Sequence, residues 1–132
     1  MAFVVDSSAI TKLIVEEQHS KILWNWVNDC KSELLISELA RTEVSRAIAR
    51  IDIDLHSQFN AIIGRFGIIR VSTQVLFIAA IINPPSLRTL DAIHLASCLM
   101  LGDDLTGFVT YDSALASAAQ INNIDVIAPG IT

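Results

Sequence analysis

The apolar residues of this chain fall first into short runs without polar interruption. Each run is flanked by polar or turn-forming residues and is rich in β-branched side chains. Runs of this kind are typical of strands that are buried on both faces of a sheet. The pattern therefore predicts strands at residues 2–5, 34–36, 68–71, 108–110 and 126–127.

Between these runs, apolar residues recur every three or four positions, which is the spacing of an amphipathic helix. Residues 40–51 and 55–66 show this spacing, and residues 87–101 continue it up to Gly102, a residue suited to the left-handed conformation that ends helices. A further helix is expected over the apolar residues 75–82. Apolar strands alternating with helices predict an α/β fold, a three-layer α/β/α sandwich with a central, mainly parallel sheet of four to five strands.

Length and composition favour one folded unit. The chain has 132 residues, of which 52% are hydrophobic, and this allows a core without disulfides and excludes a disordered chain. There is no repeat or linker, so residues 1–132 are expected to form a single domain. The longest apolar stretch is far shorter than the roughly 20 residues of a membrane span, and no basic region precedes the first apolar run. We therefore expect a cytoplasmic protein that is not associated with a membrane.

Charge and cysteine content narrow the kinds of chemistry. Cys30 and Cys98 belong to no Cys/His cluster, so they are expected to be reduced and buried rather than bridged or bound to metal. The formal charge of −5 argues against binding nucleic acid through overall charge. It does not exclude a local basic patch, or carboxylates whose charge a metal ion neutralises.

Two carboxylates follow predicted strands, where ligands of parallel α/β sheets collect. Asp6 comes directly after residues 2–5, and Asp112 follows residues 108–110 with one residue between. Each could simply cap the helix that begins after it. If the two strands are neighbours, however, both carboxylates lie at one edge of the sheet and require a cation or a shared proton. Hard oxygen ligands would favour Mg²⁺ or Mn²⁺ there.

Two further carboxylates lie on predicted helices. Asp91 shares the buried side of its helix with Leu95 and Cys98, and a carboxylate that faces inward is costly unless it is paired or binds metal. Glu43 flanks the apolar stripe of its helix, where a surface ion pair with Arg46 is an alternative to a ligand role.

Histidine, tryptophan and arginine residues supply weaker candidates. His94 stands three residues after Asp91, so it could support the site, although a hydrogen-bonded structural histidine is the simpler interpretation. Trp24 and Trp26 are expected in the core or an interface. Arg46 and Arg50 share a helix face and could contact a phosphate backbone, with simple solvent exposure as the alternative.

Taken together, the acidic motifs resemble those of PIN-domain nucleases, and most closely the VapC-type toxins of bacterial toxin–antitoxin pairs. The match runs in order through the chain, with no departure at the acidic positions. It consists of Asp6-Ser7-Ser8 after the first strand, Glu43 within Leu39-Ala40-Arg41-Thr42-Glu43-Val44-Ser45-Arg46-Ala47, Asp91 within Leu87-Arg88-Thr89-Leu90-Asp91-Ala92-Ile93-His94-Leu95-Ala96, and Thr110-Tyr111-Asp112-Ser113-Ala114-Leu115.

The resemblance implies a metal-dependent endoribonuclease. By this likeness Asp6, Glu43, Asp91 and Asp112 hold Mg²⁺ or Mn²⁺ and carry catalysis, while the hydroxyl groups of Ser7 and Thr110 support them; the family gives no secure role to Arg46 or Arg50. A metal-bound water would attack the RNA phosphorus without help from the ribose 2′-hydroxyl, leaving a 5′-phosphate and a 3′-hydroxyl. The implied partners are an RNA substrate and a cognate antitoxin that inserts a segment into the acidic groove.

Other functions compete with this one. A PIN-fold nuclease that processes RNA would share the same chemistry. A non-catalytic signalling module of the receiver type would need an Asp after the middle strand, where Ile68-Ile69-Arg70-Val71-Ser72-Thr73 has none, and a phosphatase of the haloacid dehalogenase type would need an Asp where Ser8 stands. The high mean hydropathy of +0.53 and the apolar residues 75–82 also predict a homodimer or a toxin–antitoxin hetero-oligomer.

Overall fold

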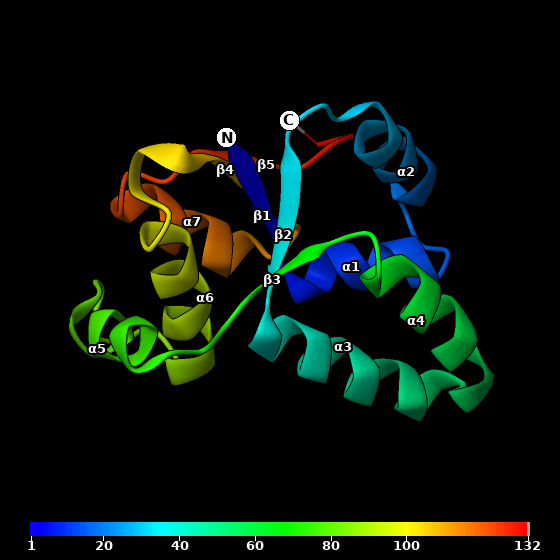
Figure 1. The fold of residues 1–132 in the computed structure, drawn as a ribbon, viewed down its shortest axis with the longest axis horizontal. Coiled ribbons are helices and arrows are strands. Elements are labelled where there is room, and N and C mark those ends of the chain that lie inside the picture. The colour runs from blue at the N-terminus through cyan, green and yellow to red at the C-terminus, as the bar shows by residue number, and fades with distance from the viewer. Residues whose placement is uncertain (132) are drawn as a thin grey trace.

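The computed structural model describes residues 1–131, which form a five-stranded sheet in which all paired strands are parallel. The order across the sheet is β3-β2-β1-β4-β5, so the first strand of the chain is the central one (Figure 1). This confirms the predicted α/β class and the parallel sheet. The strands are β1 Ala2–Val5, β2 Glu33–Ser37, β3 Gly67–Ile69, β4 Leu105–Val109 and β5 Val126–Ile127.

Two strand boundaries differ from the prediction. The run at 68–71 ends its pairing at Ile69, because the backbone N–H of Val71 donates to the Glu38 carboxylate instead of to a strand. The run at 108–110 is the second half of a longer strand that begins at Leu105, opposite the start of β1. Thr110 therefore follows β4 rather than ending it, which places its side chain at the carboxyl edge of the sheet.

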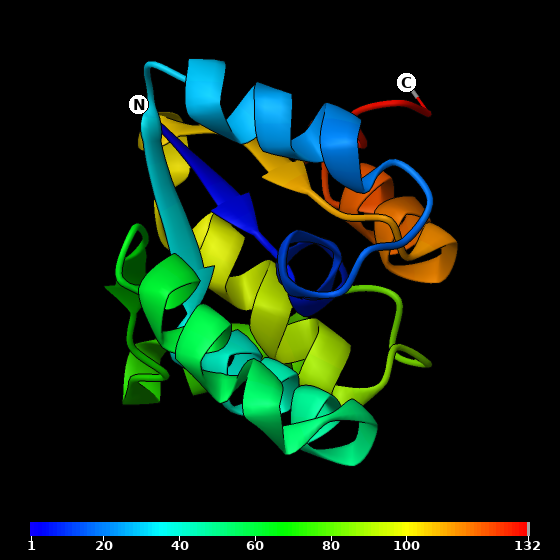
Figure 2. The same ribbon diagram turned by 90° about the vertical axis from the view of Figure 1, so that its right-hand side faces the viewer.

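Helices cover both faces of the sheet, so the fold is a three-layer α/β/α sandwich (Figures 1 and 2). One core cluster joins residues of β1 and β2 to the first four helices, and a second joins β1 and β4 to the last two. The helices are α1 Ser7–Ile14, α2 Ser20–Asp29, α3 Glu38–Ile51, α4 His56–Ile63, α5 Thr73–Ile81, α6 Thr89–Leu99 and α7 Ser113–Ile121.

The predicted helices are present with changed bounds: α3 and α5 each begin two residues before the predicted start, whereas the other two are shorter than predicted. The segment 55–66 is divided, since a 3₁₀ turn at Ile53–Leu55 precedes α4. The segment 87–101 contains α6, and Gly102 has the expected left-handed conformation with φ +53°. The interpretation of Cys30 as buried is wrong, because this free thiol is only half-buried, whereas Cys98 is fully buried and also free.

The two tryptophans lie against the core, whereas several apolar residues of α5 lie at the surface. The indole N–H of Trp24 donates to the Leu13 carbonyl, and Trp26 packs edge-on against Phe3, so both tryptophans belong to the core layer as expected. By contrast α5 buries only Val75 fully and leaves Phe77 exposed. Among residues 1–131, none of the helices has the length and apolar character that crossing a bilayer requires.

Candidate active site

The carboxyl ends of the three central strands place polar groups along one edge of the sheet. Asp6 follows β1, Ser37 ends β2, and Thr110 follows β4. The strands β1 and β4 are direct neighbours, and the N–H of Asp6 donates to the carbonyl of Val109 at 3.0 Å. The strands that precede Asp6 and Asp112 are therefore adjacent, as the prediction of one shared sheet edge required.

Asp6 is the most deeply buried carboxylate of this edge, with 2% of its surface exposed. Its Oδ1 accepts the Ser8 hydroxyl at 2.6 Å and the backbone N–H of Ala9 at 3.0 Å, and its Oδ2 accepts the hydroxyl of Thr110. Burial raises the pKa of Asp6 above its ordinary value, although these hydrogen bonds and the nearby His94 oppose the increase. Asp6 thus caps α1, as the simpler interpretation held, while its second oxygen faces β4.

Asp112 also caps a helix, since its Oδ1 accepts the backbone N–H of Leu115 at 3.0 Å at the start of α7. Its own backbone N–H donates to the Thr110 hydroxyl at 3.1 Å. Thr110 is therefore the bridge between the two aspartates, because it accepts from the Asp112 backbone and donates to the Asp6 carboxylate.

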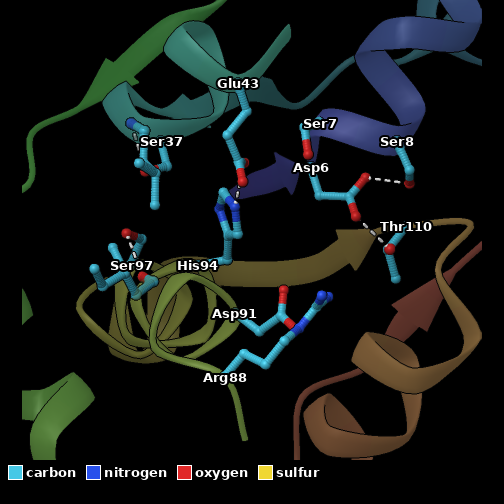
Figure 3. A network of polar contacts seen from close by, with 12 residues as sticks. Asp6, Ser7, Ser8, Ser37, Glu43, Arg88, Asp91, His94, Ser97 and Thr110 are labelled. Atoms are coloured by element: carbon cyan, nitrogen blue, oxygen red, sulfur yellow. Dashed lines mark hydrogen bonds and ion pairs between the residues drawn. The ribbon is translucent and has the colours of Figure 1, made fainter. Parts of the chain in front are cut away.

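Glu43 projects from α3 and is held by His94 of α6, with 2.7 Å between Oε1 and Nε2 (Figure 3). The expected alternative of an ion pair with Arg46 is wrong, because the carboxylate turns inward to the histidine. Partial burial acts to raise the pKa of Glu43. The hydrogen bond and charge of His94, the Ser7 hydroxyl and the charge of Arg88 outweigh it and lower that pKa.

Asp91 lies in the first turn of α6, and its side chain is 15% exposed. Its Oδ2 accepts a hydrogen bond from Nε of Arg88 at 3.1 Å and lies 3.1 Å from Nη2 of the same ion pair. Leu95 and Cys98, on the same side of the helix, are fully buried, so the inward placement expected for Asp91 is observed.

Figure 3 shows Asp6, Glu43 and Asp91 in one part of the molecule, with Asp6 turned toward Ser8 and Thr110, Glu43 toward His94, and Asp91 beside Arg88. Within residues 1–131, however, no three side chains of the His, Cys, Asp or Glu type lie close enough together to hold a metal ion. Each carboxylate instead has a partner inside the chain: hydroxyl and amide groups for Asp6, His94 for Glu43, Arg88 for Asp91 and a helix N–H for Asp112.

The donor set nevertheless fits a hard divalent cation. Carboxylate and hydroxyl oxygens are the ligands that Mg²⁺ and Mn²⁺ prefer. All the hydrogen-bond donors to Asp6 are neutral, and among the described residues no lysine or arginine forms an ion pair with it. A buried anion that lacks a cationic partner is unfavourable, and a bound cation would remove much of that cost.

Burial of Asp6 predicts a pH-dependent stability. The folded chain holds a proton on Asp6 more tightly than the unfolded chain, so this contribution to stability is present at low pH and is lost as pH rises through the raised pKa. In EDTA at pH 7.5, Asp6→Asn should therefore be more stable than the wild type by on the order of 1 kcal/mol, or several degrees in Tm. The difference, measured by thermal unfolding, should shrink as pH falls toward 4; an Asp6→Asn chain less stable than wild type at pH 7.5 would contradict it.

The sequence left some site residues unassigned. Ser8, rather than Ser7, contacts Asp6 and also accepts the backbone N–H of Tyr111 at 3.0 Å. Arg88 was not a candidate, although its position three residues before Asp91 on one helix was the available signal. Arg46 and Arg50, the predicted phosphate contacts, are exposed on α3, and their role stays a prediction.

Comparisons with known proteins agree with this architecture. A family model described as PIN domain matches residues 3–127. Ribonuclease VapC46 of Mycobacterium tuberculosis is 38% identical over 128 residues, which are 97% of this chain and 98% of that protein. Among solved structures, VapBC2 of Rickettsia felis, bound to a DNA fragment from its promoter, matches with TM-score 0.79 and 13% identity, over 98% of this chain and 99% of its own. The sarcin-ricin loop cleaving toxin VapC20 of Mycobacterium tuberculosis matches with TM-score 0.72 and 14% identity, over 88% and 94%.

Proposed function

We propose that this chain, which belongs to the PIN domain family and to its VapC-type members, is a divalent-metal-dependent endoribonuclease and the toxin of a toxin–antitoxin pair. Family membership confirms the resemblance found in the sequence. We further propose that residues 1–132 act as a single PIN domain. The observation that carries the proposal is the buried Asp6 at the carboxyl edge of the sheet, which forms no ion pair with a lysine or arginine of the described residues and lies in the same part of the molecule as Glu43 and Asp91.

In the proposed mechanism, Asp6, Glu43, Asp91 and Asp112 hold Mg²⁺ or Mn²⁺ through their carboxylate oxygens. When bound, the cation activates a water molecule and neutralises charge on the phosphate that is cleaved. The protein's own residues orient these ligands. Thr110 and Ser8 hold the Asp6 carboxylate by hydroxyl groups, and His94 holds Glu43, so each ligand is restricted in rotation before a cation binds.

Relatives support RNA as the substrate and an antitoxin as the partner. The curated relatives at 32–38% identity are named as ribonucleases, and VapC20 is described as cleaving the sarcin-ricin loop. Several structural neighbours were solved as toxin–antitoxin complexes. We favour the toxin over a PIN-fold nuclease of RNA processing because these relatives are VapC proteins. A non-catalytic signalling module has no comparable support.

An oligomer is part of the proposal. The α5 helix exposes Leu76, Phe77 and Ile81, with exposed fractions of 47%, 68% and 69%. An exposed apolar surface of this kind is typical of proteins that associate, so we infer a homodimer or a toxin–antitoxin hetero-oligomer.

The decisive experiment is incubation of the purified chain with total cellular RNA and Mg²⁺ or Mn²⁺, followed by mapping of new RNA ends. We expect discrete cuts with 5′-phosphate ends, because hydrolysis by a metal-bound water leaves the phosphate on that side. Removal of the metal with EDTA should abolish the cuts, and added Mn²⁺ should restore them. Cuts that persist in EDTA, or that carry 2′,3′-cyclic phosphate ends, would contradict a metal-dependent mechanism.

A further inference from the structure

Arg88 is a positively charged side chain that directly contacts a carboxylate of the candidate site, Asp91. It directly precedes α6, and its side chain is 79% exposed. Its Nε donates to one oxygen of Asp91, its Nη2 forms an ion pair with the same oxygen, and its charge also acts on the Glu43 carboxylate. The guanidinium therefore acts on two of the four proposed ligands, and Figure 3 shows it beside Asp91.

The pairing of Arg88 with Asp91 is easily opened. Although Asp91 is only 15% exposed, the Arg88 side chain is 79% exposed, so water and salt screen the guanidinium and the long side chain loses freedom when it is held. Arg88 and Asp91 also line an open hollow of about 320 Å³, between the segment that contains Pro84 and the side of α7 that carries Ala114 and Ser117. There is space beside the pair for the guanidinium to turn away, and for a ligand to enter.

We propose that Arg88 is a substrate-positioning residue with two partners. It pairs with Asp91 in the absence of the divalent cation, and it binds an RNA phosphate when Asp91 coordinates the cation. This inference rests on the proposed function. An Asp91 carboxylate that coordinates a divalent ion attracts the guanidinium far less, so the guanidinium becomes available to another anion. The other carboxylate within reach of its charge, Glu43, already accepts from His94.

A phosphate of the substrate is the anion that best fits the released guanidinium. The same two-donor edge that now meets the Asp91 carboxylate matches two phosphate oxygens. The overall charge of −5 provides no general attraction for RNA, so a local cation beside the carboxylates has a correspondingly large role in binding it.

Removal of Arg88 should change the affinity for Mn²⁺ in opposite directions, depending on whether Arg88 competes with the cation or only supports Asp91. If Arg88 competes with the cation for Asp91, Arg88→Gln should tighten Mn²⁺ binding by about two- to fivefold, the range expected for loss of an exposed ion pair. If Arg88 merely keeps Asp91 in position, the same change should weaken Mn²⁺ binding. Isothermal titration with Mn²⁺ measures this without any RNA. Arg65→Gln is the matched control, because Arg65 binds Asn28 in a separate hollow that also contains Glu33, the first residue of β2.

Cleavage kinetics test the phosphate contact. With an RNA that the wild-type chain cleaves, Arg88→Gln should raise KM by about tenfold or more, with a smaller change in kcat, since a charge-assisted hydrogen bond to the substrate is lost. Arg88→Lys should recover part of the loss, because it keeps the charge but not the two-donor edge. Weaker Mn²⁺ binding, or an unchanged KM in Arg88→Gln, overturns the proposal. If the wild-type chain cleaves no RNA, the proposed function fails together with the phosphate contact, whereas the Mn²⁺ titration still decides whether Arg88 competes for Asp91.

Discussion

Asp6→Asn and Asp91→Asn should each reduce RNA cleavage by about a thousandfold or more while leaving the chain folded. Asparagine has nearly the same shape as aspartate but lacks the charge that a divalent ion requires, so the variant loses transition-state stabilisation rather than structure. The measurement is kcat/KM on a mapped RNA with Mn²⁺, accompanied by circular dichroism and thermal unfolding. Full activity in both variants would contradict the proposed metal site.

The chain offers a matched control for this pair. Asp52 is also a capping aspartate, since it accepts the backbone N–H of Asp54 at 3.0 Å, but it is exposed at the far end of α3 from β2. Asparagine caps helices about as well as aspartate. Asp52→Asn should therefore keep both stability and cleavage, and a loss of activity there would show that removal of any acidic cap is harmful.

Thr110→Val should destabilise the protein by about 2–3 kcal/mol and also reduce cleavage. Thr110 is 1% exposed. Its hydroxyl donates a hydrogen bond to the Asp6 carboxylate and accepts one from the backbone N–H of Asp112. Valine has the same shape without the hydroxyl, so it leaves a buried carboxylate oxygen and a backbone N–H each without this partner. Chemical denaturation measures the free energy of unfolding, and Mn²⁺-dependent cleavage is measured on the same preparation.

Thr106, four residues earlier in β4, is the control for this substitution. Its hydroxyl is buried and has no hydrogen-bond partner among the described residues. Removing an unsatisfied hydroxyl is neutral or stabilising, so Thr106→Val should change the free energy of unfolding by about 0 to 1 kcal/mol in the stabilising direction. Equal destabilisation by both substitutions would mean that valine is simply poorly tolerated in place of a buried threonine in this part of the chain.

The layers of the fold could be predicted from the sequence because each strand and most helices carry their own periodic signal. Apolar runs such as 2–5 lie in the sheet centre, where both faces are covered, and the pattern needs no knowledge of distant residues. The start of β4 was missed since Thr106 and Gly107 interrupt the apolar run, although Leu105 and Gly107 pair with β1 and Thr106 lies at the irregularity between them. Strand limits depend on the neighbouring strand, which a local pattern does not contain.

The positions of the acidic residues were predictable, but their partners were not. Asp6 and Asp112 follow their strands closely, so their place at the sheet edge comes from the chain itself. The pairing of Glu43 with His94 joins residues 51 positions apart on two helices, and nothing in either helix alone distinguishes it from a surface pair with Arg46. Such contacts depend on how α3 and α6 pack, which is decided by the whole core.

The central place of β1 has a consequence for how the protein is made. Asp6 directly follows β1, the first of the five strands to be synthesised, but its partner Thr110 lies 104 residues later, beyond β4. Domains assemble only when the strands that complete them have emerged. A growing chain that stops before residue 110 therefore lacks the group that orients Asp6. The candidate site cannot be complete until both β1 and the segment that follows β4 have been synthesised.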